Sequence, residues 1–175
     1  MSQNNRSTNL LVPFYLGEQQ DIRKRTIEEI WTWDFEELET VHDYIQWLFP
    51  LTERSAFNSD APIVTAEIIN AFRSDPRLRQ SLMRSLEVML RFYGLQIQEN
   101  GAIARSEIYP IRKTEWIERF NHNYLRITRI LKCLMNFGFE QYAQAFYDCL
   151  AQIYREESDR IGSETFKYWT NAVQS

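Results

Sequence analysis

Residues 42–51 read HDYIQWLFPL, and this stretch is the most informative part of the chain. Within ten residues it holds four aromatic or imidazole rings and no glycine, and it runs into Pro50. The residue that precedes a proline avoids the α region, so Pro50 is expected to stop a helix. The stretch therefore predicts the end of an amphipathic helix whose rings enter a protein core.

Working back from Pro50, we expect this helix to begin after Asp34. Asp34 is a good N-cap, and Glu37 occupies the capping-box position three residues later. At about 100° per residue, one face of the helix is apolar. That face would carry Phe35, Leu38, Val41, His42, Ile45, Leu48 and Phe49.

The rest of the chain predicts an all-α, single-domain bundle of about seven helices. Besides residues 34–49, helical patterns cover residues 21–33, 64–73, 76–93, 114–120, 124–137 and 139–157, and a short stretch after Gly162. Asn100-Gly101 is a turn signal that predicts one small hairpin near residues 95–105. Residues 1–10 are predicted to be flexible. The domain would fill residues 11–175 and start with an extended strap at 11–17.

Composition sets limits on the function. The chain has 175 residues, 44% of them hydrophobic, which predicts a packed core. Its net charge of −4 argues against nucleic-acid binding, which needs clustered cations. The chain shows no secretory signal and no transmembrane run, so we expect a cytoplasmic protein. Cys133 and Cys149 are expected to be buried thiols.

The helix at 124–137 carries a basic arc of Arg126, Arg129 and Lys132 opposite its apolar side. One interpretation is a docking stripe for an acidic partner, a phosphate or a carboxylate. The other is a solvated face, or cations paired with carboxylates of a neighbouring helix. Both interpretations remain open at this point.

Three side chains of the 42–51 stretch also allow two interpretations. His42 lies in the apolar arc and would either make a structural hydrogen bond or act in chemistry. Tyr44 and Trp47 point away from that arc, so either a second layer covers them or they line an exposed aromatic pocket. Neither His42 nor His122 has ligands at metal-binding spacing, so no metal site is expected.

No catalytic signature is present. The chain has no GxSxG elbow, no P-loop, no GxGxxG after a strand and no HExxH. Adjacent acids such as Glu36-Glu37 point about 100° apart on a helix and form no dyad. We therefore expect no cofactor and a protein that is not an enzyme.

Several separate blocks of the sequence resemble the conserved domain of the opioid growth factor receptor family. The 42–51 stretch resembles the HxYIQWLFP signature of that family. The other blocks are Asn9-Leu10-Leu11 with Phe14-Tyr15, residues 89–94 (MLRFYG), residues 121–132 (NHNYLRITRILK) and residues 138–140 (GFE). Their order also agrees, so the resemblance covers roughly residues 9–155.

The resemblance implies a receptor domain for a short peptide such as methionine-enkephalin. Animal members are intracellular, occur at the nuclear envelope and in the nucleus, and carry long C-terminal extensions. A peripheral membrane contact is compatible with this resemblance. We expect this chain to represent the conserved domain alone, with a peptide or protein partner, and the role of residues 156–175 is left open.

The expected ligand-binding residues are the polar and amphipathic members of the motifs. They could form one site only if the helix at 34–49 packs beside the helix at 124–137. Two other hypotheses are an enzyme that uses His42 with a carboxylate, and an oligomeric assembly or scaffold subunit with an aromatic interface. The candidate ligand-binding residues are His42, Tyr44, Gln46, Trp47, Asn123, Arg126, Arg129 and Lys132.

Overall fold

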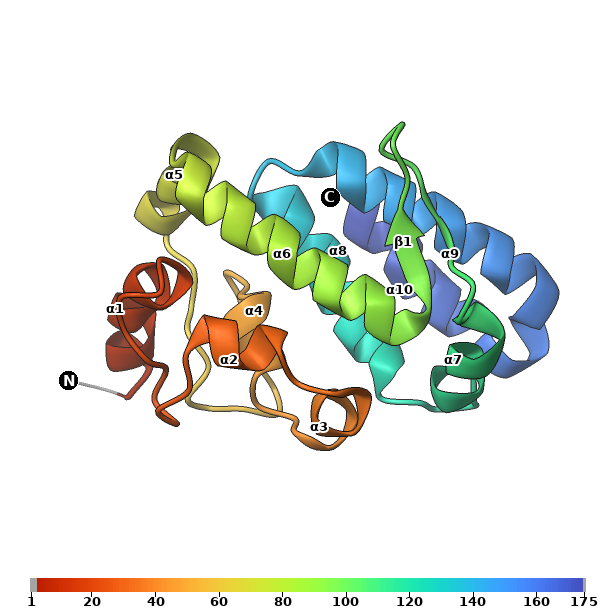
Figure 1. The fold of residues 1–175 in the computed structure, drawn as a ribbon, viewed down its shortest axis with the longest axis horizontal. Coiled ribbons are helices and arrows are strands. Elements are labelled where there is room, and N and C mark those ends of the chain that lie inside the picture. The colour runs from red at the N-terminus through yellow and green to blue at the C-terminus, as the bar shows by residue number, and fades with distance from the viewer. Residues whose placement is uncertain (1–2, 175) are drawn as a thin grey trace. The chain divides into compact units, whose positions relative to one another are not determined.

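A computed structural model describes residues 3–174 of the chain, with side chains from residue 6 onward (Figure 1). Ten helices and one two-stranded hairpin are present in these residues, which confirms the mostly helical fold class and the small hairpin. The chain divides into two compact units, with the boundary inside a helix, between Leu86 and Glu87. Each unit is described by itself below. The single domain expected over residues 11–175 stays a prediction.

The first unit begins with α1 (Gln3–Tyr15), where we expected a flexible end followed by an extended strap. The extended strap is wrong, because α1 continues to Tyr15. Met1 and Ser2 lie outside the described residues, and the flexibility expected for residues 1–10 stays a prediction. Ser7, Leu11, Phe14 and Tyr15 are buried, and this spacing forms one helical face. Thr8 also exchanges hydrogen bonds with the backbone N–H and C=O of Ile63. Tertiary contacts therefore stabilise a helix that its polar first turn did not predict.

The helix expected at 21–33 is much shorter. It is reduced to α2 (Ile27–Trp31), which Thr26 caps by accepting from the N–H of Glu29. Residues before it form a turn, because the Asp21 carboxylate accepts from the backbone N–H groups of Arg23 and Arg25. A side chain that bonds its own backbone competes with helix formation.

The helix expected at 34–49 is divided into α3 (Phe35–Thr40) and α4 (Ile45–Leu48). Its start is confirmed, since Asp34 and Glu37 form the full capping box. Val41 is extended (φ −83°, ψ 128°), so the chain changes direction there. The Tyr44 hydroxyl donates to the carbonyl of Leu38 at 2.9 Å, which ties α3 to the start of α4.

Two further helices match their predictions. The first is α5 (Ala66–Ser74), capped by Thr65, which accepts from the N–H of Ile68. The second is α6 (Pro76–Tyr93), which starts with proline after Asp75 and ends before Gly94. Gly94 has φ +77°, the left-handed conformation expected of a residue that follows a helix.

The second unit contains the hairpin and four helices that follow α6. The strands β1 (Leu95–Ile97) and β2 (Ile103–Arg105) pair antiparallel, with Gln96 opposite Ala104. The short helix expected at 114–120 is wrong: α7 spans Tyr109–Trp116, and Thr114 lies inside it, donating to the carbonyl of Ile111. The remaining helices are α8 (Asn123–Asn136), α9 (Glu140–Ile161) and α10 (Ser163–Gln174).

Helices α8, α9 and α10 pack against one another, and β2 packs on α9 (Figure 1). Gly138 turns the chain between α8 and α9 at φ +78°. The helix α8 begins one residue earlier than expected; His122 precedes it, and the His122 side chain makes no capping hydrogen bond. Inside α9, Glu157 has non-helical angles (φ −121°, ψ 24°), which matches the predicted helix end at that residue.

Candidate functional site

The aromatic residues of the 42–51 stretch are buried. Tyr44 is 0% and Trp47 is 1% exposed, so the covering layer is present and the exposed aromatic pocket is not. Part of that layer is Phe14, whose ring meets Trp47 edge-on at 5.3 Å. The Tyr15 hydroxyl donates to the carbonyl of Leu48. These contacts join α1 to α4, so the motif's large rings hold the first unit together.

His42 is exposed, whereas the sequence placed it in an apolar arc. The cause is the break after α3: the helical periodicity that would have turned His42 inward ends at Val41. His42 is therefore not a buried imidazole, and the structural hydrogen bond expected of it stays a prediction. His42 is also absent from the lining of the groove described below.

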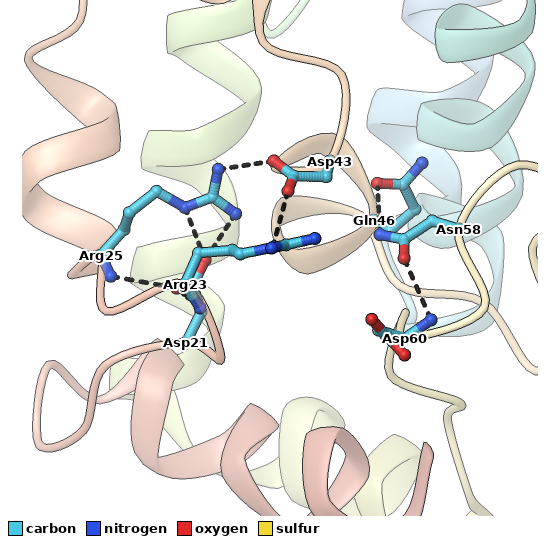
Figure 2. Close-up of polar contacts among 7 residues, drawn as sticks. All are labelled: Asp21, Arg23, Arg25, Asp43, Gln46, Asn58 and Asp60. Carbon is cyan, nitrogen blue, oxygen red and sulfur yellow. Dashed lines mark hydrogen bonds and ion pairs between the residues drawn. The ribbon is translucent and has the colours of Figure 1, made fainter. Parts of the chain in front are cut away.

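Charged groups next to the motif form a network in the first unit (Figure 2). The Arg25 guanidinium lies 2.7 Å from the Asp21 carboxylate and 2.6 Å from that of Asp43. Arg23 reaches the other oxygen of Asp43 at 3.2 Å. Burial alone would lower the pKa of Arg25, because it disfavours the charged form. The hydrogen bonds to Asp21 and Asp43 outweigh this effect, so the pKa of Arg25 is raised.

This network fixes three turns of the chain in one place. Asp21 precedes α2, Asp43 precedes α4, and the Arg25 guanidinium also lies 5.7 Å from the centre of the Trp33 ring, between α2 and α3. On the other side of α4, Gln46 accepts a 3.5 Å hydrogen bond from Asn58, whose own oxygen accepts from the N–H of Asp60 (Figure 2). The polar members of the motif thus order the loops around α4.

The second motif lies on α8, in the other unit. Asn123 and Arg126 are buried, and the Arg126 guanidinium donates to the Asn123 side chain at 3.3 Å. Arg129 and Lys132 are half-buried. Arg126 is 5% exposed, so a basic arc open to water along all three residues is wrong. Whether the basic arc docks a partner, or is a solvated face or pairs with carboxylates of a neighbouring helix, stays a prediction.

The eight candidate residues therefore do not stand as one exposed surface. His42, Tyr44, Gln46 and Trp47 belong to the first unit, and Asn123, Arg126, Arg129 and Lys132 to the second. A pocket shared by the segments 34–49 and 124–137 stays a prediction. As ligand-binding positions, the eight residues stay a prediction as well.

A groove of about 540 Å³ lies within the second unit, at a place that the sequence did not single out. Its volume falls in the range of small-ligand sites. Three segments line it: the part of α6 that belongs to the second unit, strand β1, and the turn after β2. The lining residues are Glu87, Leu90, Arg91, Leu95, Gln96, Ile97, Ser106, Glu107 and Ile108.

The backbone of β1 gives the groove an unusual wall. Around the hairpin, Gln98 donates to Ala102 at 2.8 Å and Ser106 donates to Gly94 at 2.9 Å. In an antiparallel pair, hydrogen-bonded and non-hydrogen-bonded positions alternate. The backbone N–H and C=O of Gln96 therefore point toward β2, and those of Leu95 and Ile97 point away from it. The main-chain polar groups of Leu95 and Ile97 therefore point to the outer edge. All three residues of β1 line the groove, and no residue of β2 does.

Buried titratable groups lie elsewhere in the second unit. Burial raises the pKa of the Cys149 thiol to about 11 and that of Tyr109 to about 12. Burial also raises the pKa of Cys133 far above its ordinary value. Both thiols are buried as expected, and near neutral pH both stay protonated.

Two further features of the described chain bear on its class. Over residues 3–174, no helix combines the length and the apolar character that a membrane crossing requires. In the same residues, His, Cys, Asp and Glu side chains form no group of three or more suited to a metal ion. The fold and the groove define a mostly helical protein with a groove beside strand β1.

Comparison with known proteins identifies its family. Residues 2–175 match the opioid growth factor receptor conserved region. The chain belongs to the opioid growth factor receptor family, as the motif resemblance implied. No solved structure is significantly similar to it.

Named relatives agree with this assignment. The chain is 41% identical to the opioid growth factor receptor of Mus musculus over 121 residues, which are 66% of this chain and 19% of that protein. It is 38% identical to the receptor of Homo sapiens over 121 residues, 66% of this chain and 18% of that protein. It is 37% identical to the opioid growth factor receptor-like protein 1 of Xenopus tropicalis over 136 residues, 75% of this chain and 25% of that protein. The match thus spans about a fifth to a quarter of each relative.

Proposed function

We propose that this chain is a binding domain for a short peptide, and that the peptide lies in the groove between α6 and β1. The observation that carries the proposal is this groove, whose wall offers main-chain hydrogen-bonding groups at the outer edge of β1. Peptides are recognised in this way because main-chain pairing supplies affinity and neighbouring pockets supply selectivity. The relatives are named receptors of an opioid growth factor, which agrees with a peptide ligand.

The same proposal makes the chain a receptor module and not an enzyme. Its two cysteines are buried and protonated, so neither is suited to act as a nucleophile. His42 is exposed and does not line the groove. The resemblance to the animal receptors supports action inside the cell, in the cytoplasm or at the nucleus.

Titration with methionine-enkephalin tests the proposal. Isothermal calorimetry should show saturable binding with one site per chain, and a pentapeptide of the same composition in scrambled order should bind more weakly. Absence of saturable heat at millimolar peptide would remove the receptor function. Equal binding of the scrambled peptide would also count against it, because the groove should select side chains as well as backbone.

A further inference from the structure

We infer that the groove takes its ligand as an added β-strand on the outer edge of β1, and that this ligand is an extended peptide with a positive charge beside an apolar side chain. The inference rests on the proposed peptide-binding function and goes further: it names the mode of binding and the chemistry of the partner. It also moves the expected ligand away from the α8 basic arc and from acidic partners.

The first argument is the state of the strand edge. Natural sheets protect an exposed edge with lysine, proline or a bulge, or cover it with another element. The hairpin's other strand, β2, is covered by α9. The outer edge of β1 has the sequence Leu95-Gln96-Ile97, with neither a charge nor a proline. An unprotected edge that borders a groove is suited to pair with a strand from another molecule.

The second argument is the number of backbone groups available. Ile97 is half-buried and points both its N–H and its C=O to the outer edge, whereas Leu95 is 2% exposed and its backbone groups are covered. A three-residue strand is about 10 Å long, at roughly 3.3 Å per residue. It therefore pairs with three or four residues of an extended peptide, which fits a groove of about 540 Å³.

The third argument concerns the side chains of such a peptide. In a paired strand, alternate side chains point to the same face. Leu95 is buried and Ile97 is half-buried, so the face that they share is the apolar one. Leu90 and Ile108 also line the groove, and Ile108 is 37% exposed. A peptide side chain on this face meets apolar walls, which favours an apolar residue.

The fourth argument is charge. Two carboxylates, Glu87 and Glu107, and one guanidinium, Arg91, line the groove, and all three residues are exposed. Their sum is one negative charge, in a concave site where like charges are partly shielded from water. An ammonium or guanidinium group on the peptide complements this site, whereas a carboxylate does not. Methionine-enkephalin with its free α-amino group is a suitable probe.

The decisive experiment compares Ile97→Pro with Ile97→Ala. Proline removes the Ile97 N–H that points to the groove, and this N–H has no role in pairing with β2, so an edge position can accept it. Alanine removes the same side chain but keeps the N–H. With methionine-enkephalin as probe, Ile97→Pro should raise the dissociation constant roughly tenfold relative to Ile97→Ala, the effect of a lost charge-free hydrogen bond in a closed site.

Hydrogen exchange on the unaltered protein gives a second readout that needs no variant. Peptide binding should slow exchange of the Ile97 amide while the Gln96 amide, already paired with β2, changes little. Acetylation of the peptide's amino group, or the variant Glu107→Gln, should weaken binding several-fold.

Each outcome has a distinct meaning. Saturable peptide binding with equal affinities for Ile97→Pro and Ile97→Ala, and with no change in Ile97 exchange, overturns strand addition but leaves the peptide-binding function. No peptide binding at all overturns both. A concentration-dependent dimer that Ile97→Pro abolishes would show that the β1 edge pairs with a second copy of the chain, which also overturns the inference.

Discussion

Replacement of Arg25 by methionine should destabilise the first unit strongly. Arg25 is the only group among the described residues that ion-pairs with both Asp21 and Asp43. The Asp21 side chain is 0% exposed and the Arg25 side chain 12%, so their ion pair is nearly dry. Methionine retains much of the apolar stem of Arg25 but removes the charge, which leaves a buried carboxylate without its cation.

The expected loss follows from these contacts. Breaking a buried ion pair by removal of one partner costs about 3–5 kcal/mol. Two contacts reduce this figure here: Asp21 keeps hydrogen bonds from two backbone N–H groups, and Asp43 is 32% exposed and keeps Arg23. We therefore expect the free energy of unfolding to fall by about 2–4 kcal/mol.

Urea denaturation followed by tryptophan fluorescence and by circular dichroism measures this change. The matched control is Arg23→Met, which removes a guanidinium from the same Asp43 carboxylate at a side chain that is 61% exposed. A surface pair contributes about 0–1 kcal/mol, so this variant should change little. If both variants lost the same free energy, burial of the Asp21–Arg25 pair would not be the source of stability and the reasoning would fail.

Three further outcomes are expected. Gly94→Ala should lower the free energy of unfolding by about 3 kcal/mol or more, because φ is +77° and the added Cβ would lie 2.7 Å from the Tyr109 Cα. Gly101 has open space around it, so Gly101→Ala should lower it by only about 1–2 kcal/mol; urea denaturation measures both changes. Between pH 9 and 11 the free energy of unfolding should fall by up to about 2 kcal/mol through Cys149. The thiol of the unfolded chain ionises at its ordinary pKa, whereas burial raises the pKa of the folded thiol to about 11. Cys149→Ala should show a shallower dependence of stability on pH, and identical pH profiles would contradict this explanation. Phe120→Gly should leave stability unchanged or raise it by up to about 1 kcal/mol, because Phe120 is 98% exposed at φ +62°; a clear loss of melting temperature would reveal contacts of the ring.

The long amphipathic helices could be predicted from the sequence because their apolar periodicity is sustained over many residues. This holds for α6 and α8. Gly94 directly follows the end of α6, and Gly138 lies shortly after the end of α8. The hairpin was predicted from Asn100-Gly101 and is present. In these elements the local preference of the chain and its packed state agree.

Elements that depend on distant partners could not be predicted in the same way. The polar start of α1 becomes helical because its other face is buried and because Thr8 bonds Ile63. The periodic stretch 34–49 breaks because a Tyr44 hydroxyl bond and the ion pairs of Asp43 favour a turn over a continuous helix. None of these partners is visible in a window of neighbouring residues.

The candidate site shows the same division. The motif identified the family, and its residues proved to be concentrated in packing and loop order around α4. The groove has no motif, since it is lined by three segments that carry ordinary residues. Its one sequence signal was the hairpin turn, which implies a strand with a free edge but not which edge is covered.

Amino-acid order alone was enough to establish the helical class, the family and the caps and turns that act over a few residues, because hydrophobic spacing and capping chemistry are local properties. Folding in three dimensions was needed to bury Tyr44 and Trp47, to expose His42, and to leave the Leu95–Ile97 edge beside a groove. These outcomes depend on which distant side chains cover a given surface, and burial is a property of the packed assembly of elements rather than of any one segment.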